Sequence, residues 1–174
     1  MPETEIGEAR QPSAMQFRLA VLRHHRLVYR VCYSLLRDQH EAEDAAQDAF
    51  MRYWQRGGGV RGAKAWLITV ARNVCLDRLR RSQRLNETAL LEPDQEAGEG
   101  DAEGQAEQEQ SMGLLSNLVE QLPEPQRSLI LLFDVHGLSG AECAEALELN
   151  TNQVKVYLHR ARKTLRREME RLHE

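Results

Sequence analysis

The sequence predicts an all-α protein made of two small helical domains joined by an acidic linker. Apolar side chains recur at helical spacing in two separate stretches, and no long stretch alternates with a period of two residues. Between them lies a segment of Glu, Gln, Gly, Ala and Asp with hardly a large apolar side chain. We therefore expect a flexible tail at residues 1–14, helical domains at 15–85 and 111–174, and a flexible linker at 86–110.

The charges are segregated along the chain in the same way. The formal net charge of the 174 residues is −4, but residues 85–126 contain no Lys or Arg and 11 acidic side chains. The rest of the chain has 23 basic and 16 acidic side chains, a net charge of +7. This asymmetry predicts basic domains that bind a phosphate backbone and an acidic connector that stays away from it.

Several classes of protein are disfavoured by composition. The three cysteines form no C-x-x-C pair, so we expect small buried hydrophobes rather than a disulfide scaffold or a metal site. The longest apolar run, 129–133, is too short to cross a bilayer, and the N-terminus does not resemble a signal peptide. We expect a cytoplasmic protein without membrane insertion, cofactor or metal. The scattered histidines and the glycine run form no catalytic pattern, so an enzyme is disfavoured.

Three helices are expected in the first domain. An apolar stripe from Val28 to Leu36 predicts the first, and a stripe from Ala42 to Trp54 predicts the second, which three glycines end. The third runs from about Ala63 to Arg84. Three helices with short connections form one bundle.

The third helix carries the strongest local charge of the chain. Residues 61–84 contain seven basic side chains and one acidic side chain, a net charge of +6. An ordinary solvated surface would explain the charge alone. Amide and carboxylate groups beside Arg and Trp suit an exposed base better than a smooth duplex, and the stretch interleaves such groups with its apolar stripe: Trp66, Arg72, Asn73 and Asp77.

The second domain has the spacing of a helix-turn-helix. A leucine stripe from Leu114 ends at prolines, and residues 129–135 predict a buried helix that Gly137 ends. Ser139 is expected to cap a short helix through Leu147, with Glu142 at the capping-box distance. Thr151 is expected to cap the last helix. The predicted buried stripe of that helix is Val154, Leu158, Ala161, Leu165 and Leu172.

The last helix should present a polar and basic face away from its core. Amides near a helix start can contact base edges, and cations can hold phosphates. A plain helical hairpin with a solvated basic face is the alternative. The residues predicted to bind DNA are Thr151, Asn152, Gln153, Lys155, Val156, His159, Arg160 and Lys163.

Two stretches resemble one known family, the extracytoplasmic-function (ECF) sigma factors of bacterial RNA polymerase. Residues 43–50, 66–67 and 71–81, which read EDAAQDAF, WL and ARNVCLDRLRR, resemble the second conserved region of that family. Residues 122–123, 126–127, 154–155 and 158–162 resemble the fourth. The order, the spacing and the acidic gap all agree, over roughly two-thirds of the chain.

The resemblance implies a transcription initiation factor with a division of labour. The second helix would bind core RNA polymerase through Asp44, Gln47, Asp48 and Phe50, although helix-dipole stabilisation alone would also account for its acids. The loop from Arg56 to Lys64 would help to capture a base flipped from the −10 element of promoter DNA. The last helix would enter the major groove at the −35 element, and an anti-sigma factor would hold the protein inactive. The predicted −10 contacts are Lys64, Trp66, Arg72, Asn73, Asp77, Arg78, Arg80 and Arg81.

Two departures from the family pattern stand out. The loop holds three successive glycines and no aromatic residue, which puts the shape of its base pocket in doubt. Tyr157 stands where relatives often carry a cation, which suggests a different −35 sequence.

Three rival functions remain open on the residues alone. A conventional helix-turn-helix regulator would bind an operator without polymerase. That function does not account for the acidic second helix or for the basic third helix. An enzyme lacks a recognisable catalytic constellation. A pure interaction module would use the basic faces to bind an acidic protein.

Overall fold

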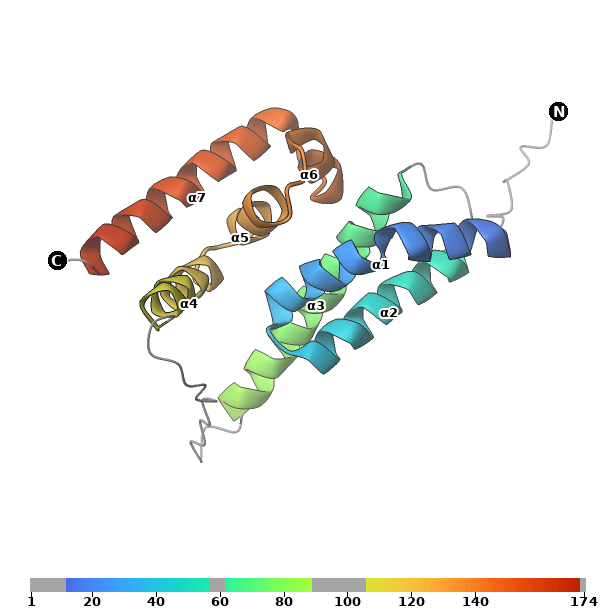
Figure 1. The fold of residues 1–174 in the computed structure, drawn as a ribbon, viewed down its shortest axis with the longest axis horizontal. Helices are drawn as coiled ribbons and strands as arrows, with labels where there is room; N and C mark the ends of the chain where they lie inside the picture. Colours follow the sequence, from blue (N-terminus) through green and yellow to red (C-terminus); the bar gives the residue numbers. More distant parts are fainter. Residues whose placement is uncertain (1–11, 57–61, 89–105, 173–174) are drawn as a thin grey trace. The chain divides into compact units, whose positions relative to one another are not determined.

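The computed structural model describes residues 12–56, 62–88 and 106–172, which fold into helices joined by turns, without a strand in these ranges (Figure 1). The chain divides into two compact units, Met1–Gln83 and Arg84–Glu174. The predicted all-α class with two helical domains is confirmed. Most of the expected tail and of the expected linker lies outside the described residues.

Three helices build the first unit: α1 (Ala14–Leu36), α2 (Gln39–Arg56) and α3 (Ala63–Thr88). A capping box between Ser13 and Gln16 starts α1, because each side chain bonds the backbone N–H of the other. Arg37, at a φ of 59°, ends α1, and the Asp38 carboxylate accepts the Glu41 N–H at 2.8 Å where α2 begins.

The core of the first unit is mostly aliphatic, in a chain with only 5% aromatic residues. Small side chains on α2 let it lie close along α1 (Figure 1). The buried side chains of α3 pack onto the same core. Cys32 and Cys75 are buried together, and their side-chain hydrogen bond and burial raise the pKa of Cys32. Buried members of this core are Val28, Val31, Leu35, Ala42, Ala45, Ala46, Ala49, Leu67, Ile68, Ala71 and Val74.

Five helical segments build the second unit: α4 (Ala106–Glu120), α5 (Gln126–Leu129), η1 (Ile130–Val135), α6 (Gly140–Ala146) and α7 (Thr151–Leu172). Two boundaries differ from the sequence expectation, because α3 continues to Thr88 and α4 already begins at Ala106. Residues 105–110 (QAEQEQ) contain no apolar stripe, but Ala, Glu and Gln are strong helix formers without a Gly or Pro among them. High helix propensity therefore explains why α4 begins at Ala106, although no apolar periodicity predicted a helix there.

The apolar stretch before the helix-turn-helix adopts a π-helix rather than an α-helix. In η1 the N–H of His136 bonds the carbonyl of Leu131, five residues back, at 2.9 Å. Ile130, Leu131 and Leu132 are buried as predicted, but Val135 is 53% exposed. Gly137, with a φ of 70°, follows the helix end as predicted.

The helix-turn-helix follows the sequence prediction closely. Ser139 and Glu142 form the predicted capping box at the start of α6. Glu148 takes a φ of 54° in the turn, at the position where Gly is common in such motifs. The buried stripe of α7 contains Val154, Leu158, Ala161 and Leu165 as predicted. Leu172, the last residue of the predicted stripe, is instead 55% exposed at the end of the helix. Across the described ranges, no helix is both long enough and apolar enough to traverse a membrane.

Candidate nucleic-acid interface

The outer face of α7 is exposed, cationic and free of acidic residues over most of its length. Asn152, Lys155, Val156, His159, Arg160 and Lys163 are all exposed, opposite the buried stripe. Residues 151–167 include six Lys and Arg side chains and no Asp or Glu. Within the described part of the chain, Lys155, Arg160 and Lys163 make no ion pair. This face can therefore attract phosphate groups without first breaking an internal contact.

The start of α7 differs from the prediction in its cap. Asn150, not Thr151, is the capping residue: its side-chain oxygen accepts the Gln153 N–H at 2.8 Å. The Gln153 side-chain oxygen in turn accepts the Asn150 N–H at 2.9 Å. Thr151 is the first residue of the helix. The capping box occupies the acceptor of Gln153, so its side-chain amide N–H remains to donate to a base edge or a phosphate.

Arg162, a residue without a predicted role, anchors α7 to η1. Its guanidinium donates to the Asp134 carboxylate at 2.6 and 3.1 Å, and it lies 5.5 Å from the centre of the Phe133 ring. The hydrogen bonds to Asp134 raise the pKa of Arg162 and outweigh the opposing effect of burial. Asp134 lies 28 positions away in the chain, so no local pattern could have identified the pair.

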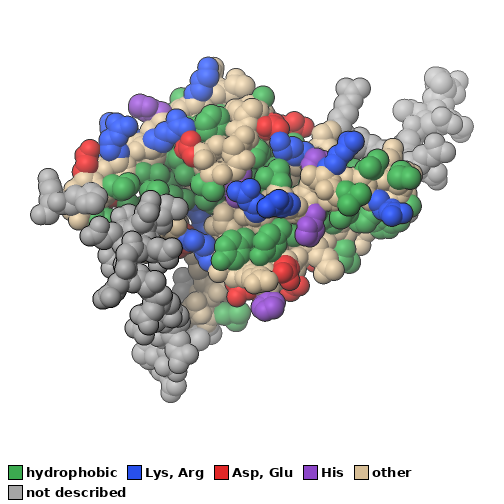
Figure 2. Space-filling view, viewed as in Figure 1, with side chains coloured by type: hydrophobic (Ala, Val, Ile, Leu, Met, Phe, Trp, Pro, Cys, Tyr) green, Lys and Arg blue, Asp and Glu red, His purple; other side chains and the backbone are tan. Residues whose placement is uncertain are grey.

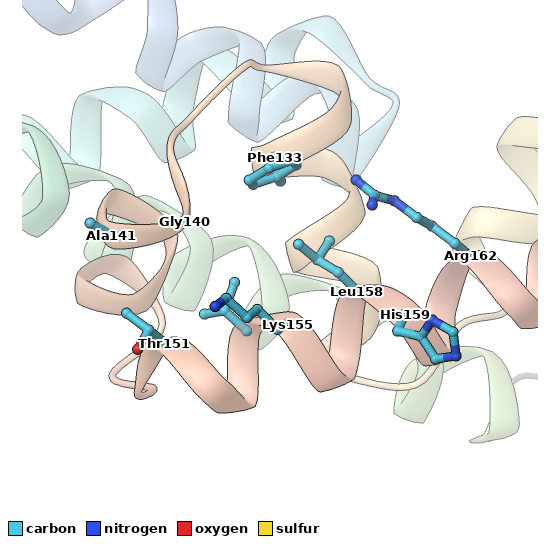
Figure 3. A pocket seen from close by; sticks show the side chains of 9 residues that line it. Phe133, Gly140, Ala141, Thr151, Lys155, Leu158, His159 and Arg162 are labelled. Atoms are coloured by element: carbon cyan, nitrogen blue, oxygen red, sulfur yellow. The ribbon is translucent and has the colours of Figure 1, made fainter.

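A groove of about 620 Å³ runs beside α7 (Figure 3). Phe133 and Leu158 give it an apolar wall, and Gly140 and Ala141 of α6 form its other side. Its polar and cationic lining comes from Thr151, Lys155, His159 and Arg162, of which Arg162 points toward Phe133 in Figure 3. The groove thus adjoins the exposed face of α7 along Lys155 and His159.

In α3, four of the predicted −10 residues share one outward stripe. Trp66, Asn73, Asp77 and Arg80 are spaced by seven, four and three residues, which places them on the same side of a helix. Asn73, Asp77 and Arg80 are exposed, and Trp66 is half-buried with its ring 5.6 Å from that of Tyr53. Arg80 donates to Asp77 at 3.1 Å.

Two other predicted −10 residues lie away from that stripe. Arg78 turns toward α2, where its guanidinium donates to Glu41 at 2.6 Å and to Asp48 at 3.0 Å. Burial lowers the pKa of Arg78, but these two carboxylates outweigh it and the net shift is upward. Lys64 lies near His24 of α1, whose pKa is lowered by burial and by the charges of Lys64 and Arg23.

The remaining predicted −10 residues differ in how exposed their side chains are. Arg81 is exposed, and Arg72 is half-buried and donates to the Asn73 side-chain oxygen at 3.4 Å. Residues 57–61 of the expected base-capturing loop lie outside the described residues. The structure therefore assembles the helical part of this predicted site: Trp66, Arg72, Asn73, Asp77, Arg80 and Arg81.

The predicted polymerase-binding set also separates into two groups. Asp44 and Gln47 are exposed on α2, three residues apart and on one face. Asp48 is half-buried and paired with Arg78. Phe50 is 6% exposed and stacks near His25, so its ring is a core residue that supports α2 rather than a surface contact. Its place in the core was predictable from the sequence, because Phe50 has the helical spacing of the other buried residues of α2, from Ala42 to Tyr53.

Among the described residues, no group of three His, Cys, Asp or Glu side chains could hold a metal ion. The exposed faces of α3 and α7 carry amides and cations. Such faces suit the recognition of an extended polyanion.

The two units match two family models of transcription initiation factors. Residues 20–85 match "Sigma-70 region 2", and residues 112–165 match "Sigma-70, region 4". The first match runs from within α1 to within α3, and the second from within α4 to within α7. The fold and the exposed basic helices thus define a sigma factor, the class of subunit that directs core RNA polymerase to promoters.

The similar proteins specify the subfamily. The chain is 31% identical over 157 residues to the ECF RNA polymerase sigma factor SigW of Bacillus subtilis, which covers 82% of each chain. It is 33% identical over 148 residues to SigM of Mycobacterium tuberculosis, over 83% of this chain and 72% of SigM. The fold resembles that of the sigma factor RpoE from Bartonella quintana, solved with the anti-sigma factor NepR, with a TM-score of 0.64 and 22% identity over 88% of this chain and 96% of RpoE. The chain belongs to the ECF RNA polymerase sigma factors.

Proposed function

We propose that the two units of this sigma factor bind two promoter elements, and that the exposed side of α2 binds core RNA polymerase. The observation that carries the proposal is the open cationic face of α7. No acid interrupts it between residues 151 and 167, and the capping box at Asn150 and Gln153 fixes its first turn. A helix of this kind can enter the major groove with its N-terminal residues toward the bases.

At the −35 element, α7 divides into base-contacting and phosphate-contacting residues. Asn152 and the Gln153 amide lie in the first turn, where amides can contact adenine edges, and Val156 offers an apolar contact for a thymine methyl. Lys155, Arg160 and Lys163 add charge along the next two turns and would hold phosphates. His159 and Thr151 lie toward the groove that Figure 3 shows.

At the −10 element, the outward stripe of α3 would bind an unpaired base. Trp66 offers a ring face, and Asn73 and Asp77 offer hydrogen-bonding groups about two and three turns further along. Arg72, Arg80 and Arg81 would hold the backbone. Arg78 would support this helix from its inner side rather than touch DNA, because its guanidinium is engaged by Glu41 and Asp48. Lys64 would add a cation near the start of the helix.

On α2, Asp44 and Gln47 would contact the polymerase directly. The Asp48–Arg78 pair and the buried Phe50 ring hold α2 in place for that contact. An anti-sigma factor would keep the protein inactive until a signal arrives, as the RpoE relative was solved with NepR. We expect the protein to bind polymerase and promoter DNA in the cytoplasm.

The test uses the purified full chain with core RNA polymerase and a promoter library. We expect a holoenzyme that starts transcription at one promoter class, together with weak binding of the free chain to duplex DNA. Asp44→Arg with Gln47→Arg should prevent association with core polymerase. Glu170→Arg, near the end of α7, adds positive charge in the other unit and serves as the control. Tight operator binding without polymerase would instead support the conventional regulator.

A further inference from the structure

Helix α1 has a second apolar stripe on the side opposite its core. The core of the first unit covers one face of α1, from Ala20 through Val28 to Leu35. The outer stripe of α1 lies half a turn away, where spacings of 4, 3, 4, 3 and 4 residues follow a heptad pattern. It consists of Met15, Leu19, Leu22, Arg26, Tyr29 and Tyr33.

This outer stripe is uncovered in the structure. Met15 is 65% exposed, Leu19 41%, Leu22 79% and Tyr33 45%. The Tyr29 and Tyr33 rings stack with centroids 6.1 Å apart, which extends the apolar surface toward the helix end. Single exposed apolar side chains are common, but a continuous exposed stripe along one helix marks an interaction surface.

The charges beside the outer stripe specify what can cover it. Four arginines, Arg18, Arg23, Arg26 and Arg30, lie on α1, and the helix has no acidic residue from end to end. In the view of Figure 2, hydrophobic and cationic side chains alternate along α1. A second copy of α1 would bring two rows of arginines together, which disfavours self-association.

The acidic segment between the two units also fits the stripe poorly. Residues 92–105 are acidic but contain no Leu, Ile, Val, Met or aromatic side chain to fill a heptad seam. We propose that the outer stripe of α1 binds an amphipathic helix of a partner protein, with apolar residues at heptad spacing and Glu or Asp on both flanks. The stripe lies on the opposite side of α1 from its contact with α2, so the partner would not touch Asp44 or Gln47.

The test uses the full chain and synthetic helices of four heptads, followed by fluorescence anisotropy. The acidic probe has Leu at its apolar heptad positions and Glu on both flanks; the basic probe has Lys on the flanks. A third probe replaces the Leu residues of the acidic helix by Ser. We expect the acidic probe to bind at least ten times more tightly than either of the others.

Leu19→Gln with Leu22→Gln should weaken the acidic probe at least tenfold, with the circular dichroism spectrum and promoter-specific transcription unchanged. Leu85→Gln, which replaces another exposed leucine (68%) at the end of α3, is the matched control and should bind as the wild type does. Equal binding of the acidic and basic probes, or an unaffected double variant, would overturn the proposal. So would binding to vesicles of phosphatidylglycerol and phosphatidylcholine without binding to the probe, or dimerisation that the double variant abolishes.

Discussion

The two basic helices, α3 and α7, use their cations differently. On α3, Arg78 is held by Glu41 and Asp48 of α2, and Arg80 lies against Asp77 of its own helix. On α7, Lys155, Arg160 and Lys163 face outward with no acid on the helix until Glu168. Two helices with a similar excess of cations thus differ: those of α3 partly stabilise the fold, whereas Lys155, Arg160 and Lys163 of α7 remain available. The first suits a shaped contact with a few groups, the second a contact with a long phosphate backbone.

The largest effect is expected on the open helix. Lys155→Ala with Arg160→Ala should reduce −35-dependent transcription by at least about tenfold, because contacts of this kind are worth about 1–3 kcal/mol each. The measurement is run-off transcription from promoters with and without the −35 element. Arg171→Ala, which removes a cation near the end of the helix beside Glu168, serves as the control. An unchanged −35 dependence in the double variant would remove α7 from the promoter.

A smaller effect is expected on the outward stripe of α3. Arg80→Ala with Arg81→Ala should slow promoter opening and lower the salt dependence of open-complex formation by about one unit of slope per lost phosphate contact. Association with core polymerase should remain intact, since both side chains are exposed on α3, and it is Arg78 whose described ion pairs join α3 to α2. Open complexes that form at the wild-type rate and with the wild-type salt slope would count against the assignment.

The inner cation of α3 should affect stability. Arg78→Gln removes both ion pairs to α2 and should lower the free energy of unfolding by about 1 kcal/mol, a value kept small because both carboxylates are substantially exposed. Urea unfolding measures it. Arg81→Gln changes the same charge on the exposed side and should leave the free energy of unfolding nearly unchanged. If the two variants unfold alike, the Arg78 pairs do not stabilise the unit.

An effect of similar size is expected at the start of α7. Asn150→Ala removes the acceptor of the Gln153 N–H and should cost about 1 kcal/mol of unfolding free energy. Thr151→Ala, one residue later, should cost much less, because Thr151 is inside the helix. The reverse order in thermal unfolding would restore Thr151 as the cap.

Periodicity predicted the parts of the fold in which one helix face is buried. The buried stripes of α2 and α7 and the Ser139–Glu142 capping box follow from spacing, since each depends on residues less than a few turns apart. The start of α4 escaped prediction because helix propensity without an apolar stripe gives no periodic signal. The π-helix η1 could not be predicted, because its run of apolar residues is compatible with any type of buried helix.

The candidate site was predictable in its residue types but less so in its pairings. The exposed face of α7 follows from its heptad-like core. The ion pairs of Arg78 with Asp48 and of Arg162 with Asp134 could not be predicted in this way, because the partners lie 30 and 28 positions apart in the sequence. Phe50 was assigned to the surface by resemblance, although its place in the buried stripe of α2 indicated the core.

The division between the two helices is tested most directly by permanganate and DNase footprinting of the holoenzyme on one promoter. The Arg80/Arg81 alanine variant should lose permanganate-reactive thymines near −10 while the −35 element stays protected. The Lys155/Arg160 alanine variant should lose protection at −35 first. If both variants lost both signals to the same degree, or if each lost the other's signal, the two helices would not act on separate promoter elements.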